Sequence, residues 1–259
     1  MNIIVFIRMV ADVVEELKIA DDLKSLDNDW IRFRLSETDE HAVEQAIILK
    51  EKYAGSVTAI AVDAPEVDDS LYIALAKGAD RAVKVSGEWF NYRSPGLARL
   101  LANFIKDNNL LDSQTIILTG SQAIDDLEGE LIYYLGEYLN IPSCGIVTSV
   151  NYHSDAGAIS VYKEFAGGLR GEYEIGLPAV IGIQAAEKPP RYIPIAKIRA
   201  IMKTAAIEEI DVPSDAIMAG CEVERLVEPQ SSGKAVMLEG SPDDIALRLI
   251  DILSEKAII

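Results

Sequence analysis

The residues of this sequence that could do chemistry gather behind one apolar run. Thr115–Leu118 is typical of a fully buried strand, and Gly120 ends it. Asp125 and Asp126 stand where we expect a helix to begin, because apolar residues then recur with a helical period: Ile132, Leu135 and Leu139. A strand, a glycine turn and a helix N-terminus hold phosphate in open α/β sheets, since free N–H groups and the helix dipole point at the ligand. An ordinary strand-to-helix turn has the same spacing, and spacing alone leaves both interpretations open.

Other chemistry-bearing residues are isolated. The two histidines, His41 and His153, have no serine or cysteine partner in a recognisable motif. Neither glycine-rich nucleotide fingerprint occurs, whether Gly-x-x-x-x-Gly-Lys-Ser/Thr or Gly-x-Gly-x-x-Gly. An adjacent pair such as Asp125–Asp126 can bind Mg²⁺ but more often caps a helix. The sequence predicts no metal site and no catalytic residues, and favours a protein that positions a cofactor which supplies the redox chemistry.

Composition narrows the classes of partner. The chain has 24 Lys plus Arg against 42 Asp plus Glu, a net charge of −18, which disfavours nucleic acid and anionic membrane surfaces. Its two cysteines, Cys144 and Cys221, form no disulfide framework or metal motif. No apolar run approaches the ~20 residues of a spanning helix, and Asn2–Val5 resembles no signal peptide. We expect no membrane insertion and a cytoplasmic location.

The chain must position these residues on alternating strands and helices. Five buried runs predict parallel strands: Asn2–Val10, Val57–Val62, Arg81–Val85, Thr115–Leu118 and Ala179–Ile183. Helices are expected from Ser36, in a capping box with Asp39, to about Tyr53, and then over Asp68–Lys77 and Ser94–Asp107. This rhythm predicts an α/β fold, a doubly wound, mostly parallel five-stranded sheet.

After Ile141 the rhythm changes. Three runs, 144–152, 158–165 and 172–176, predict an antiparallel extension that completes a nucleotide-binding-like domain over residues 1–190. Residues 191–205 carry a short basic helix, which is either a solvated face or a docking segment. Residues 206–259 read as an extended arm, irregular over 206–235, with a terminal amphipathic helix capped at Ser241. Its apolar stripe must be buried against a partner or against its own domain.

Three segments, in order and spacing, resemble the electron-transfer flavoprotein β subunit family. The first is Gly120-x-Gln122-Ala-Ile-Asp125-Asp126, the second is Glu164–Leu169 with Leu177–Val180, and the third is Arg191-Tyr192 with Ile201–Lys203. The resemblance covers nearly the whole chain. It implies a fold like that of the adenine-nucleotide α-hydrolases.

The resemblance also implies a function. Such a subunit pairs with an α subunit and shuttles electrons from a dehydrogenase, of the acyl-CoA type, to an acceptor through FAD held mainly by the α subunit. Its terminal helix wraps onto the α subunit, and its own site buries AMP or a second FAD. The matching cofactor-site residues are Phe6, Ser36, Asp39, Val62, Gly120, Gln122, Asp125, Asp126, Gly129 and Glu130. The matching dehydrogenase-docking residues are Arg191, Tyr192, Ile193, Lys197, Met202 and Lys203.

The sequence departs from the family at the nucleotide site. Phe6 stands where a small residue leaves room for adenine, Ser36-Glu37 replaces Asn-Pro, and Val13 replaces an aromatic residue near the flavin. Glu128 and Glu130 add carboxylates beside the phosphate, at a cost on the order of 4 kcal/mol per like-charge contact before screening. The β-branched Ile132 in place of glycine removes a close backbone approach.

The hypothesis is a degenerate site, filled by Phe6 and Leu131, with AMP or a second FAD doubtful. The competing interpretation is a shifted phosphate near Gly129 and a cation between Glu128 and Glu130. The alternative function is a stand-alone adenine-nucleotide-binding or regulatory module of the same fold, against which the long arm argues. An enzyme acting on a small nucleotide lacks candidate catalytic residues.

Overall fold

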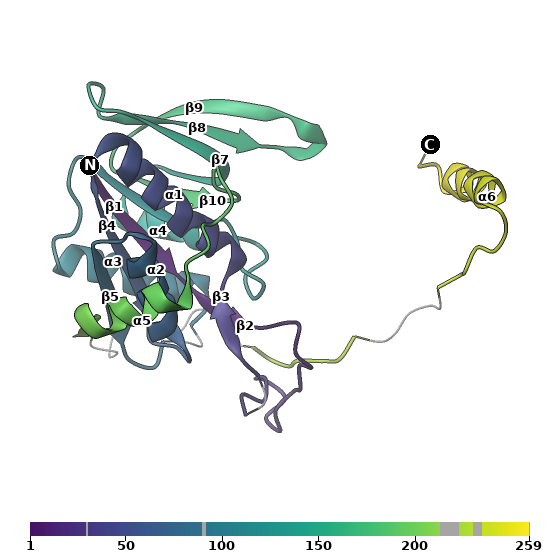
Figure 1. The fold of residues 1–259 in the computed structure, drawn as a ribbon, viewed down its shortest axis with the longest axis horizontal. Helices are drawn as coiled ribbons and strands as arrows, with labels where there is room; N and C mark the ends of the chain where they lie inside the picture. The colour runs from purple at the N-terminus through teal and green to yellow at the C-terminus, as the bar shows by residue number, and fades with distance from the viewer. Residues whose placement is uncertain (30, 90–91, 213–222, 230–234, 259) are drawn as a thin grey trace.

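The computed structural model describes residues 1–29, 31–89, 92–212, 223–229 and 235–258. Within them one nine-stranded sheet dominates, in the order β11-β5-β4-β1-β6-β10-β7-β8-β9 (Figure 1). The strands are β1 Asn2–Ile7, β4 Ser56–Val62, β5 Arg81–Ser86, β6 Thr115–Gly120, β7 Ser143–His153, β8 Ala158–Glu164, β9 Arg170–Gly176, β10 Ala179–Ile183 and β11 Glu208–Asp211.

All five predicted parallel strands are present, so the predicted doubly wound α/β fold is confirmed. The sheet is larger than predicted, because β11 pairs parallel with β5 and β7 pairs parallel with β10. The antiparallel β8 and β9 continue the same sheet beyond β7, with the turn η1 Ala166–Gly168 between them. The predicted extension is therefore an extension of the main sheet and not a separate layer.

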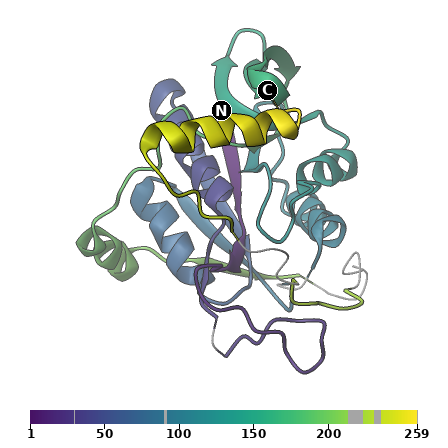
Figure 2. The ribbon, with the colours of Figure 1, turned by 90° about the vertical axis from the view of Figure 1, so that its right-hand side faces the viewer.

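Helices cover both faces of the sheet. Figure 2 shows α1 Glu37–Tyr53 and α2 Val67–Lys77 on one side of β1, and α3 Ser94–Asp107 and α4 Leu131–Leu139 on the other. Successive β1 residues point to opposite faces, so Ile3 and Val5 pack under the first pair, and Ile4 and Phe6 under the second. Phe6 thus lies within the core shared with α3 and α4.

Three local predictions in the first half of the chain need correction. The run Asn2–Val10 is split, because β2 Met9–Ala11 leaves the main sheet to pair antiparallel with β3 Phe33–Leu35. Ser36 is the N-cap residue of α1, but its side chain makes no cap hydrogen bond, and no capping box forms with Asp39. The strand at 115–118 runs on through Gly120.

The C-terminal part has two further helices, α5 Ile195–Thr204 and α6 Pro242–Glu255. The prediction that residues 206–235 are irregular is wrong for residues 208–211, which form β11. Ser241 and Asp244 form a reciprocal capping box that starts α6, and none of residues 242–255 is buried. Figure 1 shows α6 away from the sheet, beyond the arm, of which residues 213–222 with Cys221 and 230–234 lie outside the described part. Among the helices described, none is both long and apolar enough to cross a bilayer.

Candidate functional site

The sheet has its switch point between β1 and β6. From β1 the chain builds outward through β4 and β5 on one side, and then returns to place β6 and β10 on the other. Open α/β sheets bind ligands in the crevice at the carboxyl ends of the strands where the order reverses. Arg8 follows β1 and Ser121 follows β6, so both stand at this crevice.

Asp39, in the first turn of α1, bridges the crevice. Its Oδ2 accepts a hydrogen bond of 3.0 Å from the Arg8 backbone N–H, and its Oδ1 accepts one of 2.6 Å from the Gly120 N–H. A Cβ on Gly120 would lie 2.8 Å from both Asp39 N and Asp39 Oδ1, so only glycine allows this approach. Thr38 adds a hydrogen bond from its Oγ1 to the Gln122 carbonyl oxygen. The chain thus closes this crevice with its own hydrogen bonds.

The Asp39 carboxyl has a strongly perturbed pKa. Burial raises the pKa of Asp39 to about 7, against the opposing effect of the N–H groups of Gly120 and Arg8, which favour the ionised form. The guanidinium of Arg8 also lowers this pKa, and Asp125 raises it. The group therefore titrates near neutral pH.

Arg8 ties the end of β1 to the loop after β6. Its guanidinium lies 2.9 Å from Asp125 Oδ2 and 3.6 Å from Asp126 Oδ2, and its side chain is 11% exposed. Ser94, the first residue of α3, donates a hydrogen bond of 2.5 Å to Asp126 Oδ2. Both acids are therefore engaged by side chains of other elements.

The prediction that Asp125 and Asp126 start a helix is wrong. Helix α4 begins at Leu131 with Glu130 as its N-cap residue, and Asp125 and Asp126 lie in the preceding loop, residues 121–130. In the described residues no group of three or more His, Cys, Asp or Glu side chains could hold a metal ion. Strand, glycine and helix N-terminus are thus separated by a loop that is folded on itself.

Gly129 and Ser121 close that loop. Gly129 has a φ of +65°, and a Cβ there would collide with the Ser121 carbonyl oxygen, so no other residue fits. The Ser121 N–H donates to the Ile183 carbonyl at 2.9 Å, and its Oγ bonds to Gln184 Oε1 at 2.5 Å. Gln122, Glu128 and Glu130 point outward and are exposed.

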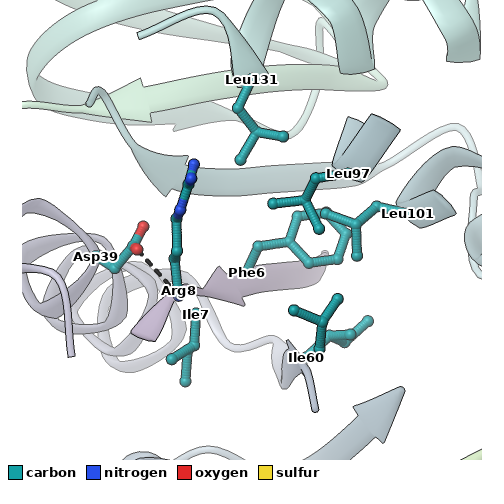
Figure 3. Close-up of a pocket in the computed structure, with 9 residues that line it drawn as sticks. Phe6, Ile7, Arg8, Asp39, Ile60, Leu97, Leu101 and Leu131 are labelled. Atoms are coloured by element: carbon teal, nitrogen blue, oxygen red, sulfur yellow. Dashed lines mark hydrogen bonds between the residues drawn. The ribbon is translucent and has the colours of Figure 1, made fainter. Parts of the chain in front are cut away.

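A small cavity of about 20 Å³ lies beside the crevice. Figure 3 shows the Phe6 ring between β1 and α3, beside Leu97 and Leu101, with Leu131 above it. The remaining lining residues are Ile7, Arg8, Asp39, Ile60 and Val62. This volume holds about one water molecule, whereas ligand sites usually measure about 300–1,000 Å³. The side chains as they lie do not fit an adenine nucleotide.

The Ile132 side chain points into the core between α4 and the sheet. Ile132 lies on the side of α4 that faces the sheet. Its Cδ1 packs on Gly182 of β10 and also reaches Gly145 of β7. A Cβ on Gly182 would collide with Ile132. Ile132 therefore packs α4 on the sheet, and its effect on phosphate binding stays a prediction.

The structure brings most of the predicted cofactor residues together. Phe6, Asp39 and Val62 line the cavity, and Ser36, Gly120, Gln122, Asp125 and Asp126 surround the crevice, while Gly129 and Glu130 lie where the loop meets α4. Sequence reasoning missed Arg8, Thr38 and Ser94 as partners. The only signal for Arg8 was a lone cation at the end of an apolar strand.

Comparison with known proteins shows which family the chain resembles in sequence. The model of the electron transfer flavoprotein domain matches residues 29–215. The chain belongs to the electron transfer flavoprotein β subunit family. It is 29% identical to the electron transfer flavoprotein subunit beta of Methylophilus methylotrophus, over 98% of each chain. It is also 29% identical to that of Bacillus subtilis, over 99% of each, and 28% to the mitochondrial one of Oryza sativa subsp. japonica, over 96% of this chain and 97% of the relative.

Membership makes the chain a subunit of a flavin-associated electron carrier and implies an α partner. The predicted docking segment, residues 191–205, is largely exposed, as a segment that contacts a partner must be. Tyr192 is 82% exposed, Ile195 62% and Met202 42%, and none of residues 195–204 is buried. Lys197 and Lys203 are exposed as well, and Ile193 is half-buried.

Arg191 differs from the other predicted docking residues. Its side chain turns onto α1 and pairs with Glu44 and Glu51, at 2.8 Å and 2.6 Å. It therefore lies between the docking segment and the body of the protein.

Proposed function

We propose that this chain is the β subunit of a heterodimer that carries electrons from an acyl-CoA-type dehydrogenase to an acceptor through FAD held mainly by the α subunit. The observation that carries this proposal is the crevice between β1 and β6, closed by Asp39 and bordered by Phe6. A closed crevice agrees with a FAD that is held mainly by the α subunit, as expected for a member of the electron transfer flavoprotein β subunit family. On this proposal the chain contributes no catalytic residue.

The second part of the proposal is that its own nucleotide site is degenerate. Phe6 and Leu131 are buried against the cavity, and Arg8 is held by Asp125 and Asp126. A phosphate at this loop would compete with two carboxylates for one guanidinium, which disfavours anion binding. The competing interpretation, a phosphate near Gly129 with a cation between Glu128 and Glu130, would have to form outside the cavity, because both glutamates are exposed.

The third part concerns partners. None of residues 242–255 of the amphipathic helix α6 is buried, so its apolar stripe is exposed in this chain. We propose that the α subunit covers that stripe. The dehydrogenase docks on Tyr192 and on α5, the exposed helix that follows Tyr192 in the chain. A stand-alone nucleotide module would have no use for a helix displayed in this way. The cytoplasmic location remains a prediction from the sequence.

The test is co-expression of the tagged chain with the α subunit of the same organism, followed by a visible spectrum and a count of FAD and AMP. We expect a yellow heterodimer with one FAD and no AMP. One AMP or two FAD per heterodimer would overturn the degenerate site but retain the carrier. A colourless, monomeric chain with bound adenine nucleotide would overturn the carrier and favour the stand-alone module.

A further inference from the structure

The segment that joins β10 to α5 lies along α1 and is held by its side chains. The backbone N–H groups of Ala186 and Glu187 donate to His41 Nδ1 at 3.2 Å and to Gln45 Oε1 at 3.1 Å. The Arg191 N–H donates to Glu44 Oε2 at 2.9 Å. Because the acceptors follow one another along one face of α1, the segment is guided along that helix.

Arg191 adds its side chain to this arrangement. Its Nε donates to Glu44 Oε1 at 2.8 Å, and its two terminal nitrogens donate to the two oxygens of Glu51 at 2.6 Å and 3.1 Å. Glu44 is almost fully buried, with 3% of its side chain exposed, whereas Glu51 is 58% exposed. The two glutamates are two turns apart on the same face of α1, and their side chains converge on the single guanidinium of Arg191. A lysine ammonium cannot make these parallel bonds.

The contact fixes the chain where the docking segment begins. Within the described docking segment, residues 191–205, only Arg191 donates hydrogen bonds to another element from both its backbone N–H and its side chain. Tyr192 follows it directly, and α5 starts three residues later, packed beside α2 with none of residues 195–204 buried. Since none of residues 195–204 is buried, the position of α5 depends on α2 beside it, on the pairing of β11 with β5 after it, and on the Arg191 contact before it.

We propose that Arg191, held by Glu44 and Glu51, is a positioning residue that presents Tyr192 and α5 to the dehydrogenase and does not itself contact that partner. This inference rests on the proposed docking function of residues 191–205. It changes the role expected of Arg191 from a surface contact to an internal clamp. Of the predicted docking residues, the side chains left to make the contact are then Tyr192, Ile193, Lys197, Met202 and Lys203.

The test uses the co-expressed heterodimer with Arg191→Lys, and with Glu51→Gln, which leaves the buried Glu44 paired. Arg170→Lys is the matched control, because two nitrogens of Arg170 also contact a glutamate, at 3.1 Å and 2.9 Å from Glu164 Oε1, at the edge of the sheet opposite β11 and away from the docking segment. The measurements are hydrogen exchange of the amides of residues 186–204, and steady-state reduction of the heterodimer by an acyl-CoA dehydrogenase of the same organism.

We expect Arg191→Lys to speed exchange over residues 191–204 by about tenfold or more and to raise KM for the heterodimer by about tenfold with kcat retained. Glu51→Gln should change both the exchange rate and KM to a smaller extent, and Arg170→Lys should change neither. Unchanged exchange in Arg191→Lys would overturn the clamp. Faster exchange with an unchanged KM would overturn its role in docking, and if Tyr192→Ala also left KM unchanged, the docking function itself would fall.

Discussion

Asp39 and Gly120, 81 residues apart, are joined by a hydrogen bond of 2.6 Å from the Gly120 N–H to the Asp39 carboxylate. The bond connects the first turn of α1 to the end of β6. It lies at the switch point of the sheet, where a ligand would otherwise meet both elements. Several properties of the protein should therefore respond to changes at this point.

The first prediction concerns pH. Because burial raises the pKa of Asp39 to about 7, above the ~3.9 of an unfolded chain, the folded state binds the proton more tightly. The contribution of Asp39 to the free energy of unfolding is therefore present below about pH 4 and is lost as pH rises to about 7. Urea unfolding between pH 4 and pH 8 should show this decline in the wild type. Asp39→Asn should remove that part of the pH dependence, and an unaltered profile would contradict the assignment.

Gly120 should be intolerant of a side chain. In Gly120→Ala the new Cβ would lie 2.8 Å from Asp39 N and would collide with Thr38, so α1 has to shift. We expect a loss of about 1–3 kcal/mol in the free energy of unfolding, measured with urea. Gly176→Ala is the control, since a Cβ there meets nothing within 4 Å. Equal stability of the two variants would show that the approach is not tight.

Arg8 should matter more than the exposed acid it binds. Arg8→Met leaves Asp126, 9% exposed at its side chain, without its cation, and we expect a cost of about 3–5 kcal/mol. Asp125→Asn alters a partner that is 39% exposed, so about 1 kcal/mol or less is expected. Thermal or urea unfolding of both variants gives the comparison. The reverse order of stability would argue against Arg8 as the tie between β1 and the loop.

Removing the Phe6 ring should open the closed site. Phe6→Ala enlarges the cavity beside Asp39 and is expected to let the heterodimer bind AMP, measured by calorimetry, where the wild type binds none. The control is Phe104→Ala, which removes the same side-chain volume from the same core but outside the cavity lining. Each variant is expected to lose about 3–5 kcal/mol in the free energy of unfolding. Equal AMP binding by both variants would mean that Phe6 does not occlude the site.

The terminal helix should act in assembly and not in folding. Leu249 and Ile252 lie on the same stripe of α6 and are 46% and 36% exposed. Changing both to Asp should weaken association with the α subunit by about tenfold or more, while the unfolding of the isolated chain stays unchanged. Leu247→Asp, on the opposite side of α6, is the control. Sedimentation of the co-expressed pair provides the measurement, and intact heterodimer in the double variant would contradict the assignment.

Signals that depend on a few neighbouring residues were readable from the sequence. The four buried runs from Val57 onward, the helix that starts at Ser94-Pro95, the end of α2 at Gly78 and the cap of α6 at Ser241 all lie where predicted. Burial, proline and capping act within one or two turns, so their consequences appear in the local pattern. The three family-like segments likewise indicate the electron transfer flavoprotein β subunit family, because such motifs lie in short stretches of the sequence.

What only the tertiary structure decided are contacts between residues far apart in the chain. Asp125 and Asp126 resemble a helix cap because acids precede an apolar period, but Arg8, 117 residues away, takes Asp125 instead. Asp39 resembles half of a capping box, yet its carboxylate accepts hydrogen bonds from the backbone N–H groups at the ends of β1 and β6. Arg191 resembles a surface cation, yet it lies against Glu44, 147 residues earlier. A charged side chain takes the partner that the sheet topology brings within reach, and a one-dimensional pattern contains the types of residue but not these distances.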